Sequence, residues 1–328
     1  MKPSSNTADM TKGSPVRLIL TFSVPLIIGN IFQQFYNMVD SIVVGNFVGA
    51  NALGAVGACG SLNWLFFSLS SGLGIGIGVI VSQFYGAKRF DKVSETIANS
   101  FYVLISSALV VSILCYLIAP AVLRLLKTPD DIINDSITYM RTTCLGIVAI
   151  SLYNGVSSTL RALGDSKTPL YFLILSSICN VLLDLLFVIS FGWGVFGVAF
   201  ATILSQALSA VVSLFYAFKK ISYFHLTKKQ LKPDFLIIKN SYRLGVPIAL
   251  QSSMIAVSCV FLQSIVNSFG STVVSAYTIT NRIEQLINQP YNSIGTALTT
   301  YAGQNIGAGD TERVKLGFKK INWHYCCV

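Results

Sequence analysis

Eight long apolar runs divide the sequence, and they constrain its fold more than any other feature. They cover approximately residues 17–44, 52–83, 95–123, 137–160, 169–191, 194–218, 244–267 and 273–303. A helix needs roughly 20 mostly apolar residues to cross a bilayer, and each run is at least that long. Only 11% of the 328 residues are charged, against about a quarter in a soluble domain. The sequence therefore predicts an all-α, multi-pass membrane protein with about eight transmembrane helices.

The basic residues predict which way these helices run. Most of them fall before the first run, in the second-to-third, fourth-to-fifth and sixth-to-seventh connections, and after the eighth run. The other side carries only Arg124, Lys127 and Arg141, and Arg282 lies inside the eighth run. Because cytoplasmic loops collect Lys and Arg, the N-terminus is predicted to be cytoplasmic. The same pattern accounts for the net charge of +10, so the lipid bilayer is the expected partner and nucleic acid is not.

An internal repeat indicates how the spans are grouped. Seven residues recur 221 positions later: Gly49, Ala55, Gly74, Gln83, Gly86, Ala87 and Val93 correspond to Gly270, Ala276, Gly295, Gln304, Gly307, Ala308 and Val314. Six spans separate the copies, so both copies face the same way, as in parallel-repeat transporters. The predicted units are a cytoplasmic segment (1–16), a six-helix N-lobe (17–218), a basic linker (219–243) and a partial C-lobe with an atypical tail (244–328).

Three acidic residues lie inside the apolar runs, where a carboxylate is costly and usually marks an ion or substrate path: Asp40, Asp184 and Glu284. Counting from the span ends places Asp40 and Asp184 at similar depths, about 8–10 Å inside the outer boundary. Tyr36 and Asn180 precede them by one helical turn, and Thr202 reaches the same layer from the sixth span. The sequence thus predicts one oxygen-rich layer in the N-lobe.

Such a layer suits either Na⁺, which takes carboxylate, carbonyl and hydroxyl ligands, or a proton held by a desolvated carboxylate. The alternative for the two aspartates is pairing with Arg124 or Arg141 at the outer interface. For Asn180, Tyr36 and Thr202 the alternative is hydrogen bonding between helices. Glu284 is predicted to be either part of a second transport site or the partner of Arg282.

Three further features concern helix packing, helix shape and the absence of enzymatic motifs. Gly72, Gly74, Gly76 and Gly78 resemble a nucleotide loop, but they lie inside an apolar span with no strand before them, which favours close helix packing. Pro25 and Pro247 lie within spans and predict kinks. With only two histidines and no metal-ligand spacing, the chain is expected not to be an enzyme and to need no cofactor beyond a coupling ion.

Several motifs together resemble the MATE (multidrug and toxic compound extrusion) transporters, and specifically their bacterial DinF-like branch. The resemblance covers residues 15 to about 320. Its first motif is the run from Pro25 through Gln33, Gln34, Tyr36 and Asp40 to Gly45. The others are Gln83 to Lys88 with its counterpart Gln304 to Gly309, the loop Arg161 to Pro169, and Asn180 to Asp184.

The resemblance implies a monomeric exporter of two six-helix lobes in the bacterial plasma membrane, which is driven by Na⁺ or H⁺ and expels small organic cations. It implies a cation site made of Asp40, Asn180, Asp184 and Thr202, with Na⁺ at Asp40 and Asp184. Tyr36 and Asn154 match positions that line the cavity, and Glu284 is assigned to the cavity as well.

The sequence departs from the family pattern in one respect. Helices nine to twelve are missing, and residues 321–328 match no family pattern, so a truncated or frameshifted member is expected. Two alternative functions therefore stay open: a flippase for lipid-linked precursors from the same superfamily, whose cavity should be richer in arginine, and a truncated membrane protein that does not transport.

Overall fold

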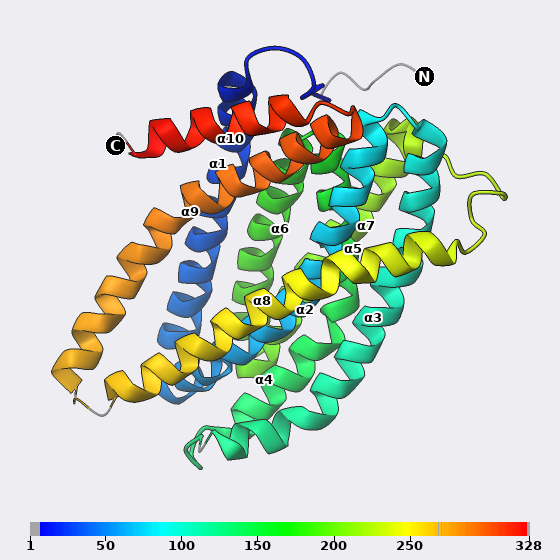
Figure 1. Cartoon of the computed structure of the whole chain (residues 1–328). Coiled ribbons are helices and arrows are strands. Elements are labelled where there is room, and N and C mark those ends of the chain that lie inside the picture. Colours follow the sequence, from blue (N-terminus) through cyan, green and yellow to red (C-terminus); the bar gives the residue numbers. More distant parts are fainter. Residues whose placement is uncertain (1–6, 127, 268, 270, 327–328) are drawn as a thin grey trace.

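The computed structural model of the protein describes residues 7–126, 128–267, 269 and 271–326, which form a bundle of long helices (Figure 1). Seven α-helices precede the basic loop: α1 (Pro15–Val43), α2 (Ala50–Gly86), α3 (Phe90–Leu125), α4 (Ile133–Leu145), α5 (Ile147–Ala162), α6 (Lys167–Leu185) and α7 (Gly194–Lys220). Three follow it: α8 (Phe235–Asn267), α9 (Ser271–Gly307) and α10 (Thr311–Cys326). Two π-helical turns, η1 (Val44–Val48) and η2 (Leu186–Ser190), extend α1 and α6, and a 3₁₀ turn, η3 (Ser222–Phe224), follows α7.

Length and hydropathy identify five spans in the described part of the chain: α1 with η1, α2 from Leu62 onward, α3, α6 with η2, and α7. The predicted fourth span is a bent pair, because α4 and α5 meet at 47°. Gly146 stands at this bend, where a Cβ atom would come within 2.8 Å of Ile203 on α7. α8 and α9 are more polar, but at 33 and 37 residues they are long enough to cross; α8 packs against α2 and α3, and α9 packs against α1 and α2.

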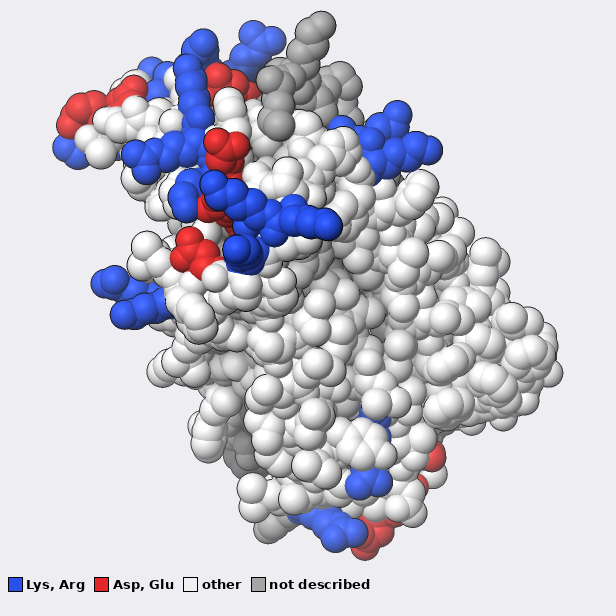
Figure 2. Space-filling view, turned by 90° about the vertical axis from the view of Figure 1, so that its right-hand side faces the viewer, with Lys and Arg blue, Asp and Glu red and all other residues white. Residues whose placement is uncertain are grey.

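The charged residues separate the two ends of the bundle. Figure 2 shows Lys and Arg gathered at the upper end of the visible face, a broad uncharged belt below them, and a few charges at the lower end. The N-terminal segment and α10 lie at the same upper end in Figure 1. We call this the inner end, following the predicted cytoplasmic side, and the opposite end the outer end.

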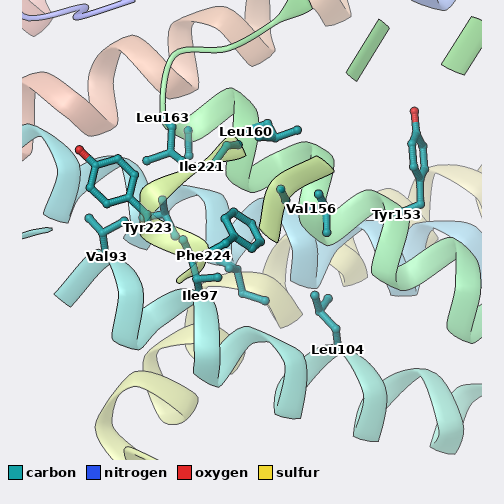
Figure 3. Packing of buried hydrophobic residues seen from close by; sticks show 14 of the residues in the cluster. Val93, Ile97, Leu104, Tyr153, Val156, Leu160, Leu163, Ile221, Tyr223 and Phe224 are labelled. Carbon is teal, nitrogen blue, oxygen red and sulfur yellow. The ribbon is translucent and has the colours of Figure 1, made fainter. Parts of the chain in front are cut away.

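The predicted linker is partly structured. Tyr223 and Phe224 are buried, and Figure 3 shows the segment around them packed with residues of α3 and α5, including Ile97 and Leu160. α8 begins at Phe235, nine positions earlier than the apolar pattern predicts. The Asp234 carboxylate explains this, since it accepts the backbone N–H of Leu236 at 2.9 Å and therefore caps the helix. α10 was not anticipated, because its sequence has no apolar run of membrane length.

The glycines of α2 pack as predicted, against helices on two sides. A Cβ atom on Gly72 or Gly76 would come within 2.6 Å of backbone atoms of α8, at Ala249 and Gly245 respectively. Gly74 and Gly78 face α5 instead, next to Asn154 and Ser158. Close packing of this kind needs residues without side chains, so the run serves helix contacts.

The repeat reappears as a reciprocal contact between the two lobes. A Cβ atom on Gly86 of α2 would overlap the carbonyl oxygen of Gln304 on α9, and one on Gly307 would overlap the carbonyl oxygen of Gln83. Gly86 and Gly307 are repeat equivalents, as are Gln83 and Gln304. Each glycine therefore contacts the glutamine from the other copy of the repeat. This reciprocity is what a two-fold axis passing between α2 and α9 produces.

Candidate functional site

The structure brings Asp40 and Asp184 together, as the depth count predicted. Asp40 lies on α1 and Asp184 on the neighbouring helix α6, and their carboxyl groups are close enough to interact electrostatically. Asp184 is completely buried. Each aspartate is followed within a few residues by a π-helical turn, and the two turns contact each other. Single π turns inside α-helices recur at functional sites, because they turn side chains and backbone groups out of the regular register.

Asn180 and Thr202 lie beside this carboxylate pair. The Asn180 amide nitrogen donates to the Thr202 hydroxyl at 3.5 Å, and that hydroxyl donates to the Val198 carbonyl one turn earlier on α7. The four residues predicted to form the cation site therefore come from three adjacent helices, α1, α6 and α7. We call Asp40, Asn180, Asp184 and Thr202 the acidic site.

The buried oxygen atoms of the acidic site lack hydrogen-bond donors. Both carboxylate oxygens of Asp184, Oδ1 of Asp40 and Oδ1 of Asn180 are buried, and no N–H or O–H group of a described residue reaches them. Two ionised carboxylates only accept hydrogen bonds, so they cannot bond to each other unless one of them is protonated. Leaving such groups unpaired is costly, so these oxygens are suited to a cation as their partner. Carboxylate, amide and hydroxyl oxygens are the ligands of hard cations such as Na⁺.

A cavity of about 400 Å³ opens beside the acidic site. Asp40 and Thr202 form part of its wall, and the aromatic rings of Tyr36, Trp64 and Phe67 form another part. Asp40 is the only charged residue among its described lining residues. Aromatic faces and a carboxylate attract organic cations, whereas an anion would find no cationic side chain among the described lining residues. We call this space the outer cavity.

Tyr139 belongs to this site, although the sequence reasoning did not name it. It is buried on α4, lines the outer cavity, and interacts electrostatically with Asp40, Asp184 and Tyr36. Tyr139 lies only two residues inside the predicted fourth span, which begins at residue 137, so the depth count did not place it with Thr202. In the structure α4 begins at Ile133, and Tyr139 lies six residues after that start.

Two predicted cavity residues lie elsewhere. Asn154 on α5 is next to Gly74 of α2 and is not among the residues that line the outer cavity. Glu284 on α9 is exposed and accepts a hydrogen bond from the Asn288 amide at 3.5 Å. The side chain of Arg282, its predicted alternative partner, lies outside the described residues.

The outer arginines do not neutralise the acidic site. Arg141 stacks over the Tyr116 ring at 5.0 Å, and no ion pair between described residues includes Asp40 or Asp184. Within the described part of the chain, no three His, Cys, Asp or Glu side chains are arranged to hold a metal ion. The acidic site is thus a pair of carboxylates supplemented by neutral oxygens.

Comparison with known proteins identifies the family to which the chain is similar. A family model described as MatE matches residues 25–186 and 247–323. The probable multidrug resistance protein YpnP of Bacillus subtilis is 35% identical over 309 residues, which are 93% of this chain and 68% of that protein. The probable multidrug resistance protein YoeA of the same organism is 30% identical and is covered to the same extent, 68%. The chain thus spans about two thirds of the length of these relatives.

Solved structures of similar fold include two with a TM-score of 0.90 and 25% identity, each covering 97% of this chain and 70% of the other. One is a MOP superfamily transporter from Pyrococcus furiosus, in which the reverse polarity of the binding pocket suggests a different function. The other is a multidrug resistance MATE family transporter in an outward-facing conformation. Since the family model covers more than half of the chain and the relatives agree with it, this protein belongs to the MATE family of multidrug efflux transporters.

Proposed function

We propose that the chain couples the binding of Na⁺ or H⁺ at the acidic site to the export of small organic cations through the outer cavity. The observation that carries this proposal is the set of buried oxygens without hydrogen-bond donors on Asp40, Asn180 and Asp184. They lie beside a cavity in which Asp40 is the one charged residue among the described lining residues. A coupling cation and an organic cation would both bind to the negative charge of Asp40.

This arrangement gives a physical route for exchange. Two neighbouring carboxylates repel each other when both are ionised, and a bound Na⁺ or proton replaces that repulsion with attraction. A bound cation therefore favours close approach of α1 and α6, whereas an empty site favours their separation. A ligand shifts a conformational equilibrium only when it binds one state better. A site whose oxygens come from both α1 and α6 would bind a cation better when these two helices are close.

α1 also provides a connection to the second lobe. The Asn30 amide of α1 donates to the Ser293 hydroxyl of α9 at 3.0 Å. Pro25 lies one and a half turns earlier and removes a backbone hydrogen bond within α1, which makes a bend there less costly. A change in α1 at the acidic site can thus reach α9 through this helix.

The polarity of the outer cavity favours export of organic cations over the flippase alternative. A site for a lipid-linked precursor needs cationic side chains to hold phosphates. Neither arginine nor lysine lines the outer cavity in the described part of the chain.

The direct test is ethidium flux in proteoliposomes that contain the purified chain. A Na⁺ gradient at equal pH and a pH gradient without Na⁺ are imposed separately, which also identifies the coupling ion. We expect one gradient to drive ethidium movement and Asp40→Asn to reduce the rate by roughly tenfold or more, because a charged contact is lost.

Asp131→Asn is the matched control, since Asp131 is an exposed aspartate in the α3–α4 connection and should transport as the unchanged chain does. Gradient-driven flux that is equal in Asp40→Asn and in the unchanged chain would contradict the proposed role of Asp40.

A further inference from the structure

A second cavity lies between the lobes, toward the inner end. It has a volume of about 320 Å³, and its walls come from α2, α5 and α9. Its chemistry differs from that of the outer cavity. The one charged residue among its described lining residues is Arg161, and much of the remaining wall consists of hydroxyl groups, including Ser82, Ser158, Thr296, Thr299 and Thr300. We call this space the inner pocket.

Arg161 has no carboxylate partner in the described part of the chain. Its guanidinium donates to the Ser158 hydroxyl at 3.0 Å, and none of the ion pairs between described residues includes it. Asp165 is the carboxylate nearest in sequence, but it is occupied at the start of α6. There it accepts the backbone N–H groups of Lys167 and Thr168 and the Thr168 hydroxyl, at 2.6 to 3.1 Å.

An arginine that is half-buried between helices of a membrane protein normally pairs with a negative group. Arg161 also lies in the last turn of α5, where a cation interacts favourably with the helix carbonyls. That interaction explains why a basic residue is tolerated at this position. It does not explain why the guanidinium lines a cavity whose other polar groups are hydroxyls.

The hydroxyl groups can respond to a negative ligand. At present Ser82 donates to Val79, Thr296 to Asn292 and Thr299 to Gly295, all to carbonyls of their own helix. Those carbonyls also take part in the regular helix bonds, so losing the hydroxyl leaves them satisfied. The hydroxyl protons are therefore free to rotate toward an oxyanion.

We propose that the inner pocket binds an oxyanion, with the Arg161 guanidinium as its charged contact and the hydroxyls of α2 and α9 as additional donors. The carboxylate of a small ligand and the phosphate of a lipid headgroup share this chemistry. Arg161 presents a planar fork that matches either group. The pocket is separate from the acidic site and does not depend on the coupling role proposed for Asp40.

The test uses the purified chain in phosphatidylcholine nanodiscs, with potassium benzoate as the carboxylate probe and benzamide as its uncharged counterpart. Binding is followed by calorimetry and by the thermal unfolding midpoint, against potassium chloride at equal ionic strength. We expect saturable binding of benzoate but not of benzamide. Arg161→Gln should weaken benzoate binding by roughly tenfold or more, since a charged hydrogen bond is lost.

A second arm replaces part of the lipid with phosphatidylglycerol. If the natural oxyanion is a lipid phosphate, the anionic lipid should raise the unfolding midpoint of the unchanged chain, and Arg161→Gln should remove that rise. Arg124→Gln is the matched control, since Arg124 is an exposed arginine near the outer end of α3 and should behave as the unchanged chain in both arms.

Thr299→Val keeps the charge and the fold of the pocket while it removes one hydroxyl, and it should weaken benzoate binding about threefold. This variant keeps the proposal testable if Arg161→Gln does not fold. Equal binding of benzoate and benzamide, or binding and lipid responses that are unchanged in Arg161→Gln and Thr299→Val, would overturn the proposal.

Discussion

The outer cavity and the inner pocket lie along the same helix, α2, yet they have opposite charge and depend on different contacts. The outer cavity belongs to one lobe, carries Asp40 and is rich in aromatic rings. The inner pocket lies between the lobes, carries Arg161 and is rich in hydroxyls. Packing within the N-lobe shapes the first, whereas the second exists only while α9 lies against α2. Any motion of the lobes relative to each other should therefore change the inner pocket more than the acidic site.

The lobes are also joined at the inner end. The reciprocal glycine contacts hold α2 against α9, and the N-terminal segment crosses this junction. Gln304 accepts the backbone N–H of Met10 at 2.9 Å and donates to the Ala162 carbonyl at 2.9 Å, so one side chain of α9 ties two parts of the N-lobe side together. Variants at the two ends should therefore affect different properties, cation affinity at the outer end and stability of the lobe junction at the inner end.

The largest effect is expected at the acidic site. Asp184→Asn removes a buried carboxylate from a set of oxygens that has no donors of its own. We expect cation affinity, measured by isotopic Na⁺ binding or by proton uptake, to fall roughly a hundredfold, because losing a charged contact costs about 3 kcal/mol. An affinity within twofold of the unchanged chain would mean that Asp184 is only structural.

The next effect concerns the junction of the lobes. Gly86→Ala places a Cβ atom against the Gln304 backbone, and we expect it to lower the free energy of unfolding by about 1–3 kcal/mol. Gly57→Ala is the matched control, because a Cβ atom there meets nothing within 4 Å and α2 should gain slightly from the better helix former. Denaturant midpoints of both variants provide the comparison, and equal midpoints would argue against the reciprocal contact.

A smaller and more local effect is expected for Gln304→Ala. It removes two buried hydrogen bonds, and we expect the N-terminal segment to open more readily by about 1–2 kcal/mol. Hydrogen exchange at the Met10 amide should accelerate roughly tenfold, while the acidic site keeps its cation affinity. Gln251→Ala, an exposed glutamine of α8, should leave that amide unchanged. An unchanged exchange rate in Gln304→Ala would show that other contacts hold the segment.

The smallest effect is expected for Tyr139→Phe. This change removes one hydroxyl near Asp40 and keeps the ring, so cation affinity should fall only about threefold to tenfold. Tyr171→Phe is the control, since Tyr171 is 61% exposed on α6 and should have no effect. Tyr139 would be merely part of the core if both variants bound cations equally.

The sequence was most informative about the N-lobe. Asp40, Asn180, Asp184 and Thr202 could be placed in one layer because a helix has a fixed rise per residue and the span ends are marked by charge. The reciprocal α2–α9 contact likewise follows from the repeat, and the glycine run behaves as a packing surface. These features depend on local periodicity and on depth, which a single sequence records.

The features that were missed depend on contacts between distant segments. The π-helical turns after Asp40 and Asp184 have no amino-acid pattern that distinguishes them from α-helix. The bend at Gly146 depends on the approach of Ile203. Asn154 was assigned to the cavity from the family resemblance, and in the structure it lies next to Gly74 of α2 and does not line the outer cavity. Glu284 and the inner pocket depend on how α9 lies against the N-lobe, which no local pattern specifies.

The role most in need of a test is the binding of the coupling cation by Asp40 and Asp184. It is tested most directly by titrating the thermal stability of the purified chain against NaCl, with potassium chloride at equal ionic strength as the reference, and against pH between about 5 and 8. A ligand that binds only the folded protein stabilises it by about 2.7 kcal/mol at a hundred times its Kd. We expect the unchanged chain to respond to Na⁺ or to protons and the double variant Asp40→Asn/Asp184→Asn to lose this response. A double variant that responds as strongly as the unchanged chain would contradict the role of the two aspartates in cation binding.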